Sequence, residues 1–90
     1  RPEELWRAAR MGCHFSFGEL SLATRRGREY VREVPRELLL TETDLPAGEK
    51  VFGSAQEISL SLGRAIEKAS EIRDEDVGAL AASNAKALLA

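Results

Sequence analysis

The stretch LLLTETDLP, residues Leu38–Pro46, joins a run of leucines to two closely spaced carboxylates and ends in a proline. The apolar run predicts a buried β-strand over residues 38–43. Because side chains alternate across a strand, Leu40, Glu42 and Asp44 share one face, with Asp44 where the strand ends. Binding sites in parallel α/β proteins lie at the carboxyl ends of strands, so Asp44 is a candidate site residue. An aspartate that caps the following turn fits the same pattern.

The residues before this stretch complete a strand–helix–strand unit. Residues 13–17 (CHFSF) alternate in polarity between Gly12 and Gly18, which predicts another strand. Residues 22–34 carry an apolar stripe among charged side chains, as expected of an amphipathic helix that Pro35 ends. The length of this connection suits a parallel crossover.

Three further helices are predicted around this unit. They run from Pro2 to about residue 11, over residues 54–70, and from the acidic triplet at residues 74–76 onward. In the last helix Asn84 interrupts an apolar stripe, so we expect it to bind backbone near a strand end. Two parallel strands leave both sheet edges open, which indicates part of a larger sheet or barrel.

Composition and charge restrict the function. The chain has 90 residues, a net charge of −2 and one cysteine, Cys13. This charge does not favour unaided binding to a polyanion, so a nucleic-acid substrate would require metal ions. The single cysteine excludes an internal disulfide and fits a reducing compartment. No apolar stretch approaches the ~20 residues that cross a bilayer, so we expect a cytoplasmic protein with no membrane partner.

Three motifs together resemble the TatD-type metal-dependent deoxyribonucleases, the TatD-like hydrolase family. The segments GCHFSFG (residues 12–18) and VPRELLLTETDLP (residues 34–46) resemble the last two strands of that family. The acidic start of the last helix and its Asn84-Ala85 pair resemble the family's closing helix. The resemblance implies an α/β fold, the C-terminal part of a TIM-like (β/α)8 metallohydrolase barrel. Residues 1–90 would then be a single partial domain with two parallel strands and about four helices.

The resemblance implies a site role for Asp44. It would be a catalytic metal ligand that orients or deprotonates an attacking water, with Mg²⁺, Mn²⁺ or Zn²⁺ as the ion and DNA or another phosphodiester as substrate. The family's other ligands, a His-x-His pair, a glutamate and further histidines, come from strands outside these residues. The segment alone is therefore expected to be inactive. After Pro46 the sequence AGEKVFG departs from the family's usual pattern, which leaves substrate preference open.

Several other polar residues have two interpretations. Glu42 would either orient a metal ligand or pair with an interior donor. His14 and Ser16 fit packing or local hydrogen bonds better than a site role. The arginines of the 22–34 helix are mixed with glutamates, which favours a solvated outer face; they are Arg25, Arg26, Arg28 and Arg32.

Two alternative functions stay open at this point. One is a free-standing α/β domain that acts through binding or assembly, with its sheet completed by self-association through the open strand edges. The other is a metallohydrolase barrel for a small ester or amide. If the chain is instead the C-terminal part of a TatD-like barrel, a missing N-terminal barrel segment completes the sheet. A His-x-His motif upstream of Arg1 would identify that segment.

Overall fold

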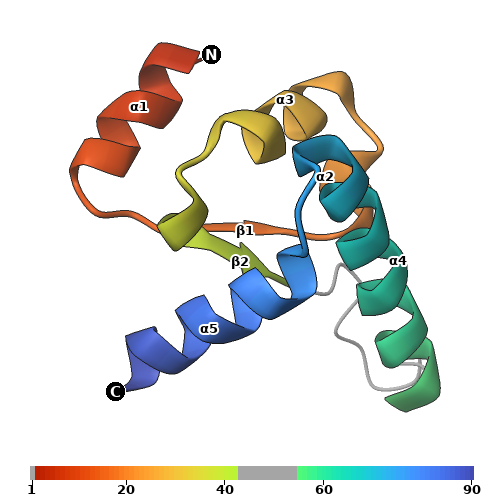
Figure 1. The fold of residues 1–90 in the computed structure, drawn as a ribbon. Helices are drawn as coiled ribbons and strands as arrows, with labels where there is room; N and C mark the ends of the chain where they lie inside the picture. Colours follow the sequence, from red (N-terminus) through yellow and green to blue (C-terminus); the bar gives the residue numbers. More distant parts are fainter. Residues whose placement is uncertain (1, 43–54) are drawn as a thin grey trace, which may run out of the picture.

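The computed structural model describes residues 2–42 and 55–90. Its elements, shown in Figure 1, are α1 (Pro2–Arg10), β1 (Phe15–Phe17), α2 (Glu19–Leu22), α3 (Arg25–Glu33), the 3-10 helix η1 (Arg36–Leu38), β2 (Leu39–Thr41), α4 (Ala55–Arg73) and α5 (Val77–Leu89). These residues form an α/β unit with five α-helices and two strands. No helix among them is long and apolar enough to span a membrane.

The two strands pair in parallel, as the crossover predicted. Phe17 lies opposite Thr41 in the register. The backbone N–H of Glu42 donates to the carbonyl of Phe17 at 2.8 Å, which continues the ladder beyond β2. Both strands are three residues long and so shorter than expected from the sequence, although Thr43 lies outside the described residues.

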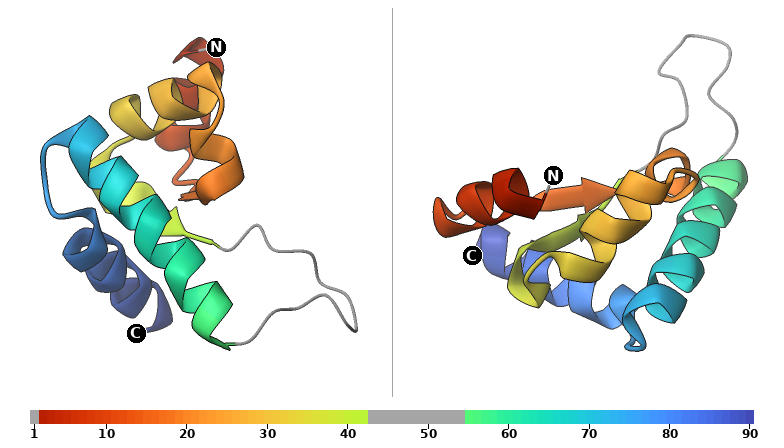
Figure 2. Two further views of the ribbon diagram at one scale, coloured as in Figure 1. Left: turned by 90° about the vertical axis from the view of Figure 1, so that its right-hand side faces the viewer. Right: turned by 90° about the horizontal axis from the view of Figure 1, so that it is seen from above.

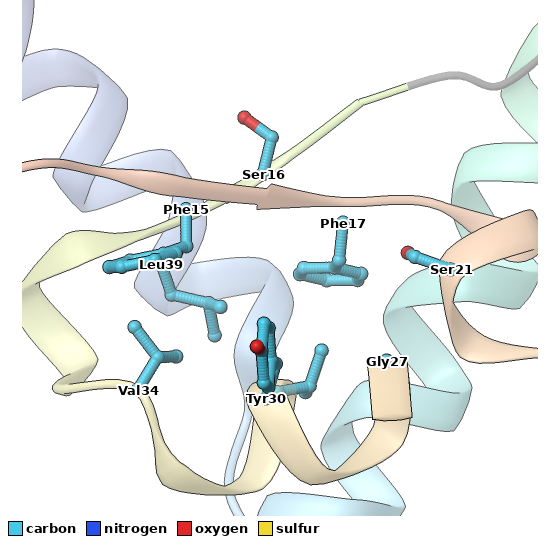
Figure 3. Close-up of a pocket in the computed structure, with 9 residues that line it drawn as sticks. Phe15, Ser16, Phe17, Ser21, Gly27, Tyr30, Val34 and Leu39 are labelled. Atoms are coloured by element: carbon cyan, nitrogen blue, oxygen red, sulfur yellow. The ribbon is translucent and has the colours of Figure 1, made fainter. Parts of the chain in front are cut away.

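Helix α3 packs on one face of the strand pair. Phe15 and Phe17 point from β1 toward α3, where Tyr30 and Val34 lie, whereas Ser16 points to the opposite side (Figure 3). Helix α5 packs on β2, and α4 lies beside α5, as two further views show (Figure 2). The buried core on this side consists of Leu5, Phe17, Leu22, Val31, Val34, Leu39, Ala65, Ala69, Val77 and Leu80.

The helix expected over residues 22–34 is present as α3, and it is preceded by a short helix, α2, that the sequence did not predict. The hydroxyl of Thr24 accepts the N–H of Gly27 at 3.0 Å and so begins a new helix. A Cβ at Gly27 would lie 1.7 Å from the carbonyl oxygen of Ser21, so only glycine lets α3 approach α2 this closely. Hydrophobic periodicity shows which face of a helix is buried, but it does not show that the chain changes direction between α2 and α3.

Replacing Gly27 tests this close approach. We expect Gly27→Ala to lower the free energy of unfolding by about 1–3 kcal/mol, because α2 and α3 must move apart. Gly63→Ala is the matched control: Gly63 lies in α4 with nothing within 4 Å of an added Cβ, so it should stabilise by up to ~1 kcal/mol. Urea unfolding of both variants gives the comparison, and equal stability of Gly27→Ala and the parent protein would refute the contact.

A buried arginine ties the end of α3 to the end of α4. The side chain of Arg73 is only 9% exposed, and its Nη1 donates to the carbonyls of Val31 at 2.8 Å and Val34 at 2.7 Å. Its Nε donates to Glu75 at 2.8 Å, and Arg36 donates to the other oxygen of that carboxylate at 3.0 Å. Hydrogen bonds from Arg73 and Arg36 hold the pKa of Glu75 below its ordinary value.

The acidic triplet between α4 and α5 starts the last helix, as the sequence predicted. Asp76 is the N-cap and accepts the N–H of Ala79 at 3.1 Å. Asp74 adopts a left-handed conformation with φ of 55°, which aspartate and asparagine tolerate better than most residues. In this turn Asp76 therefore contributes its side-chain oxygen as a helix cap, whereas Asp74 contributes its left-handed backbone conformation.

The predicted backbone contact of Asn84 is confirmed. Its Nδ2 donates to the carbonyl of Arg36 at 2.7 Å and to the carbonyl of Leu39 at 2.9 Å. Leu39 is the first residue of β2, so the amide holds α5 against the start of the strand. This contact explains a polar side chain within an otherwise apolar stripe.

The lowered pKa of Glu75 predicts how stability depends on pH. A carboxyl whose pKa is lower in the folded state stabilises the fold above its ordinary pKa of 4.5, and this contribution disappears as pH falls through the folded value. Glu75→Gln should therefore unfold at a lower temperature than the parent protein at pH 7, with a smaller difference at pH 3. Thermal melts at both values measure this, and a difference that does not change with pH would contradict the ion pair.

Candidate functional site

The face of the strand pair opposite the helices is the candidate site surface. Ser16 on β1 lies opposite Leu40 on β2 in the register, and Glu42 follows on the same side by strand alternation. Ser16 and Glu42 are exposed, and Leu40 is half-buried. Parallel strands are ordinarily covered on both faces, as in a barrel whose interior is filled by side chains from its strands. In the barrel that the family resemblance implies, this face would be part of the inner wall.

The carboxyl ends of both strands meet at a short turn after β1. The Glu42 N–H donates to the carbonyl of Phe17 at this point. In the next residues the N–H of Gly18 donates to the hydroxyl of Ser21 at 2.9 Å, and that hydroxyl donates to the Gly18 carbonyl at 2.9 Å. The turn is thus fixed by hydrogen bonds on both sides of Gly18.

Glu19, the first residue of α2, binds two side chains of α4. It accepts the hydroxyl of Ser61 at 2.8 Å and two guanidinium N–H groups of Arg64 at 2.6 and 3.1 Å. These hydrogen bonds, that from Arg64 first, lower the pKa of Glu19 below its ordinary value. The sequence does not reveal this cluster. Ser61 and Arg64 share a helix face by their spacing, but nothing local identifies their partner.

Of the two sequence-predicted site residues, the structure describes only Glu42. Asp44, the principal candidate, lies outside the described residues. Glu42 is exposed at the carboxyl edge, so it makes no buried pair within the described part of the chain. His14 is exposed before β1, at the opposite end of the strand pair from Glu42. Cys13 is also exposed and lies before β1 rather than within it.

The arginines of α3 face outward for the most part, as predicted. Arg25, Arg26 and Arg32 are exposed, and Arg25 pairs with Glu29 at 3.5 Å on the surface. Arg28 is half-buried because its Nη1 donates to the carbonyl of Leu22 at 3.1 Å. The group does not form a phosphate-binding patch near the candidate site surface.

A complete metal site is not present within residues 2–42 and 55–90. No group of three or more His, Cys, Asp and Glu side chains in these ranges could hold an ion. The single carboxylate at the carboxyl edge, Glu42, cannot hold a catalytic metal alone. The described donors therefore do not fit a metal ion without further ligands.

A small cavity lies on the other side of β1, among the core residues that face α3 (Figure 3). Its volume is about 90 Å³, and apolar side chains such as Phe17, Tyr30 and Val34 line it. No charged side chain is among its lining residues. The cavity is a gap in helix packing, separated by the strands from the candidate site surface.

Comparison with known proteins gives one family. No curated protein matches the chain. The family model described as TatD related DNase matches residues 1–90. Proteins of this family are hydrolases with a TIM-barrel fold and are generally metal-dependent, in agreement with the parallel strands and the uncovered inner face described above. Because the match covers every residue, the chain belongs to the TatD related DNase family.

Proposed function

We propose that this chain is the C-terminal part of a metal-dependent deoxyribonuclease that hydrolyses phosphodiester bonds, with Asp44 as a metal ligand. The carboxyl edge of the strand pair carries this proposal. There the Glu-Thr-Asp motif begins at Glu42, directly after β2, and its first N–H is bound to Phe17. On the strand face that continues into this edge, Ser16 and Glu42 are exposed. A motif carboxylate that follows a strand at this edge is well placed for a barrel active site.

Each part of the motif has a distinct role in this proposal. Asp44 supplies a carboxylate oxygen, which suits Mg²⁺, Mn²⁺ or Zn²⁺. A bound ion would lower the pKa of water and stabilise negative charge on the phosphoryl group. Glu42, which is exposed directly after β2, would orient a neighbouring metal ligand. The net charge of −2 means that the ion, rather than the surface of this segment, attracts DNA.

The missing ligands would come from an N-terminal barrel segment. Each described strand has a single strand neighbour, so β1 and β2 each have one edge without a strand partner among the described residues, although Asn84 binds the Leu39 carbonyl of β2. A segment with the remaining strands would pair with these edges and cover Ser16 and Leu40 from the inside. We place the assembled enzyme in the cytoplasm, where its unpaired Cys13 stays reduced.

Substitution of Asp44 tests the proposal. In the intact protein, Asp44→Asn should reduce Mn²⁺-dependent hydrolysis of a DNA oligonucleotide by about 100-fold or more, because asparagine lacks the ligand charge. The thermal midpoint should change little. Steady-state kinetics at saturating Mn²⁺ and thermal melts measure the two effects.

Asp74→Asn is the matched control. It makes the same chemical change at an exposed aspartate whose left-handed conformation also suits asparagine. This residue follows α4 and lies far along the chain from the motif, so the variant should keep the parent activity. Normal turnover by Asp44→Asn, or equal loss in both variants, would refute Asp44 as a ligand.

A further inference from the structure

Ser16, Leu40 and Glu42 lie on the face of the strand pair that is turned away from α3. Ser16 is opposite Leu40 in the register, and its side chain points away from the core (Figure 3). Glu42 follows Leu40 by two residues and projects to the same side by strand alternation. In the described structure Ser16 and Glu42 are exposed, and Leu40 is half-buried. A complete barrel would enclose this face.

Gly18 leaves space between Ser16 and Glu42. The Glu42 N–H is bound to the carbonyl of Phe17 at 2.8 Å, which continues the register and places Gly18 beside Glu42. The backbone of Gly18 is extended, with φ of −145°, so the alternation of β1 continues to this residue. A rise of ~3.3 Å per residue and a strand spacing of ~4.8 Å put the Cα atoms of Ser16 and Glu42 about 8 Å apart. A glutamate side chain that leans over the glycine reaches a serine hydroxyl at this separation.

A carboxylate on the inner wall of a barrel requires hydrogen-bond donors. Removal of a charged group from water is strongly unfavourable unless the group is paired or hydrogen-bonded. The described neighbours of Glu42 on this face are Leu40, which is apolar, Gly18, which has no side chain, and Ser16, whose hydroxyl can donate. His14 lies before β1 begins, two residues farther from the carboxyl edge. Ser16 is therefore the side-chain donor that the strand pair offers to Glu42.

We propose that Ser16 donates a hydrogen bond to Glu42 once the barrel encloses this face, and that Ser16 is thereby a positioning residue for the active site. The hydrogen bond rests on the TIM-barrel fold of the family, whereas its effect on catalysis rests on the proposed function. A hydroxyl that binds one carboxylate oxygen fixes the rotamer of Glu42, and so the direction in which Glu42 meets a neighbouring ligand. Removal of partners of this kind around a metal typically costs about 10–100-fold in affinity or activity.

Ser16→Thr and Ser16→Val in the intact protein test the hydrogen bond. Both new side chains are β-branched and similar in volume, so they suit a strand equally and differ in the hydroxyl. Ser16→Val should melt roughly 3–10 °C below Ser16→Thr, because it leaves the Glu42 carboxylate without its donor. In the Glu42→Met background, which removes the acceptor, this difference in melting temperature should vanish or reverse.

Mn²⁺-dependent hydrolysis of a DNA oligonucleotide measures the effect on catalysis. We expect kcat of Ser16→Val to be about tenfold below that of Ser16→Thr, with KM for DNA nearly unchanged, because a positioning residue does not touch the DNA. Ser83→Ala is the matched control, since it removes an exposed hydroxyl from α5. It should keep the parent kcat and KM, and its melting temperature should stay within about 2 °C of the parent value.

Three results would overturn the inference. One is an equal melting temperature for Ser16→Thr and Ser16→Val. Another is a difference that persists in the Glu42→Met background, because the hydroxyl would then bind another group. The third is an equal kcat in the two Ser16 variants, which would refute the positioning role. If the coupling to Glu42 is present but Asp44→Asn turns over normally, the proposed function fails and the hydrogen bond stands.

Discussion

Burial of a single apolar sheet face is the constraint on which the described structure depends. Two parallel strands of three residues provide few hydrogen bonds, and such a pair is not stable in water alone. Phe17 and Leu39 bury their side chains beneath the helices, and this burial holds the pair in place. Arg73 satisfies carbonyls at the carboxyl end of α3, and Asn84 satisfies the carbonyl of Leu39 at the start of β2. The opposite face has no such cover among the described residues, in keeping with a wall that becomes buried only in a complete barrel.

Local sequence signals were sufficient for most elements of the fold. Alternation identified the first strand, an apolar run identified the second, and the length of the crossover gave their parallel pairing. The turn at Gly12 ends α1 as a helix stop, with φ of 81° and its N–H bound to the carbonyl of Ala9. Asn84 was predicted to bind backbone because a buried amide requires a partner. Gly12 and Asn84 were informative because few residues other than glycine adopt a positive φ, and because a buried amide must form hydrogen bonds.

The features that sequence reasoning missed depend on residues far apart in the chain. The close approach of the Ser21 carbonyl makes glycine a requirement at position 27, between α2 and α3. Glu19 and Arg64 are 45 residues apart, and no local pattern joins them. The candidate site was predictable only as a motif: Asp44 was identified by its place after a strand and by family resemblance. Its partners could not be identified because the described residues do not contain them.

The amide of Asn84 has a consequence for the order in which the protein is made. It follows Leu39 by 45 residues, yet it satisfies a carbonyl at the very start of β2. The strand therefore leaves the ribosome well before the helix that completes its hydrogen bonds. Until α5 emerges, a nascent chain carries a strand pair with an unsatisfied end and an exposed Leu39, the kind of surface that chaperones bind. Final closure of this region therefore waits until α5 has been synthesised.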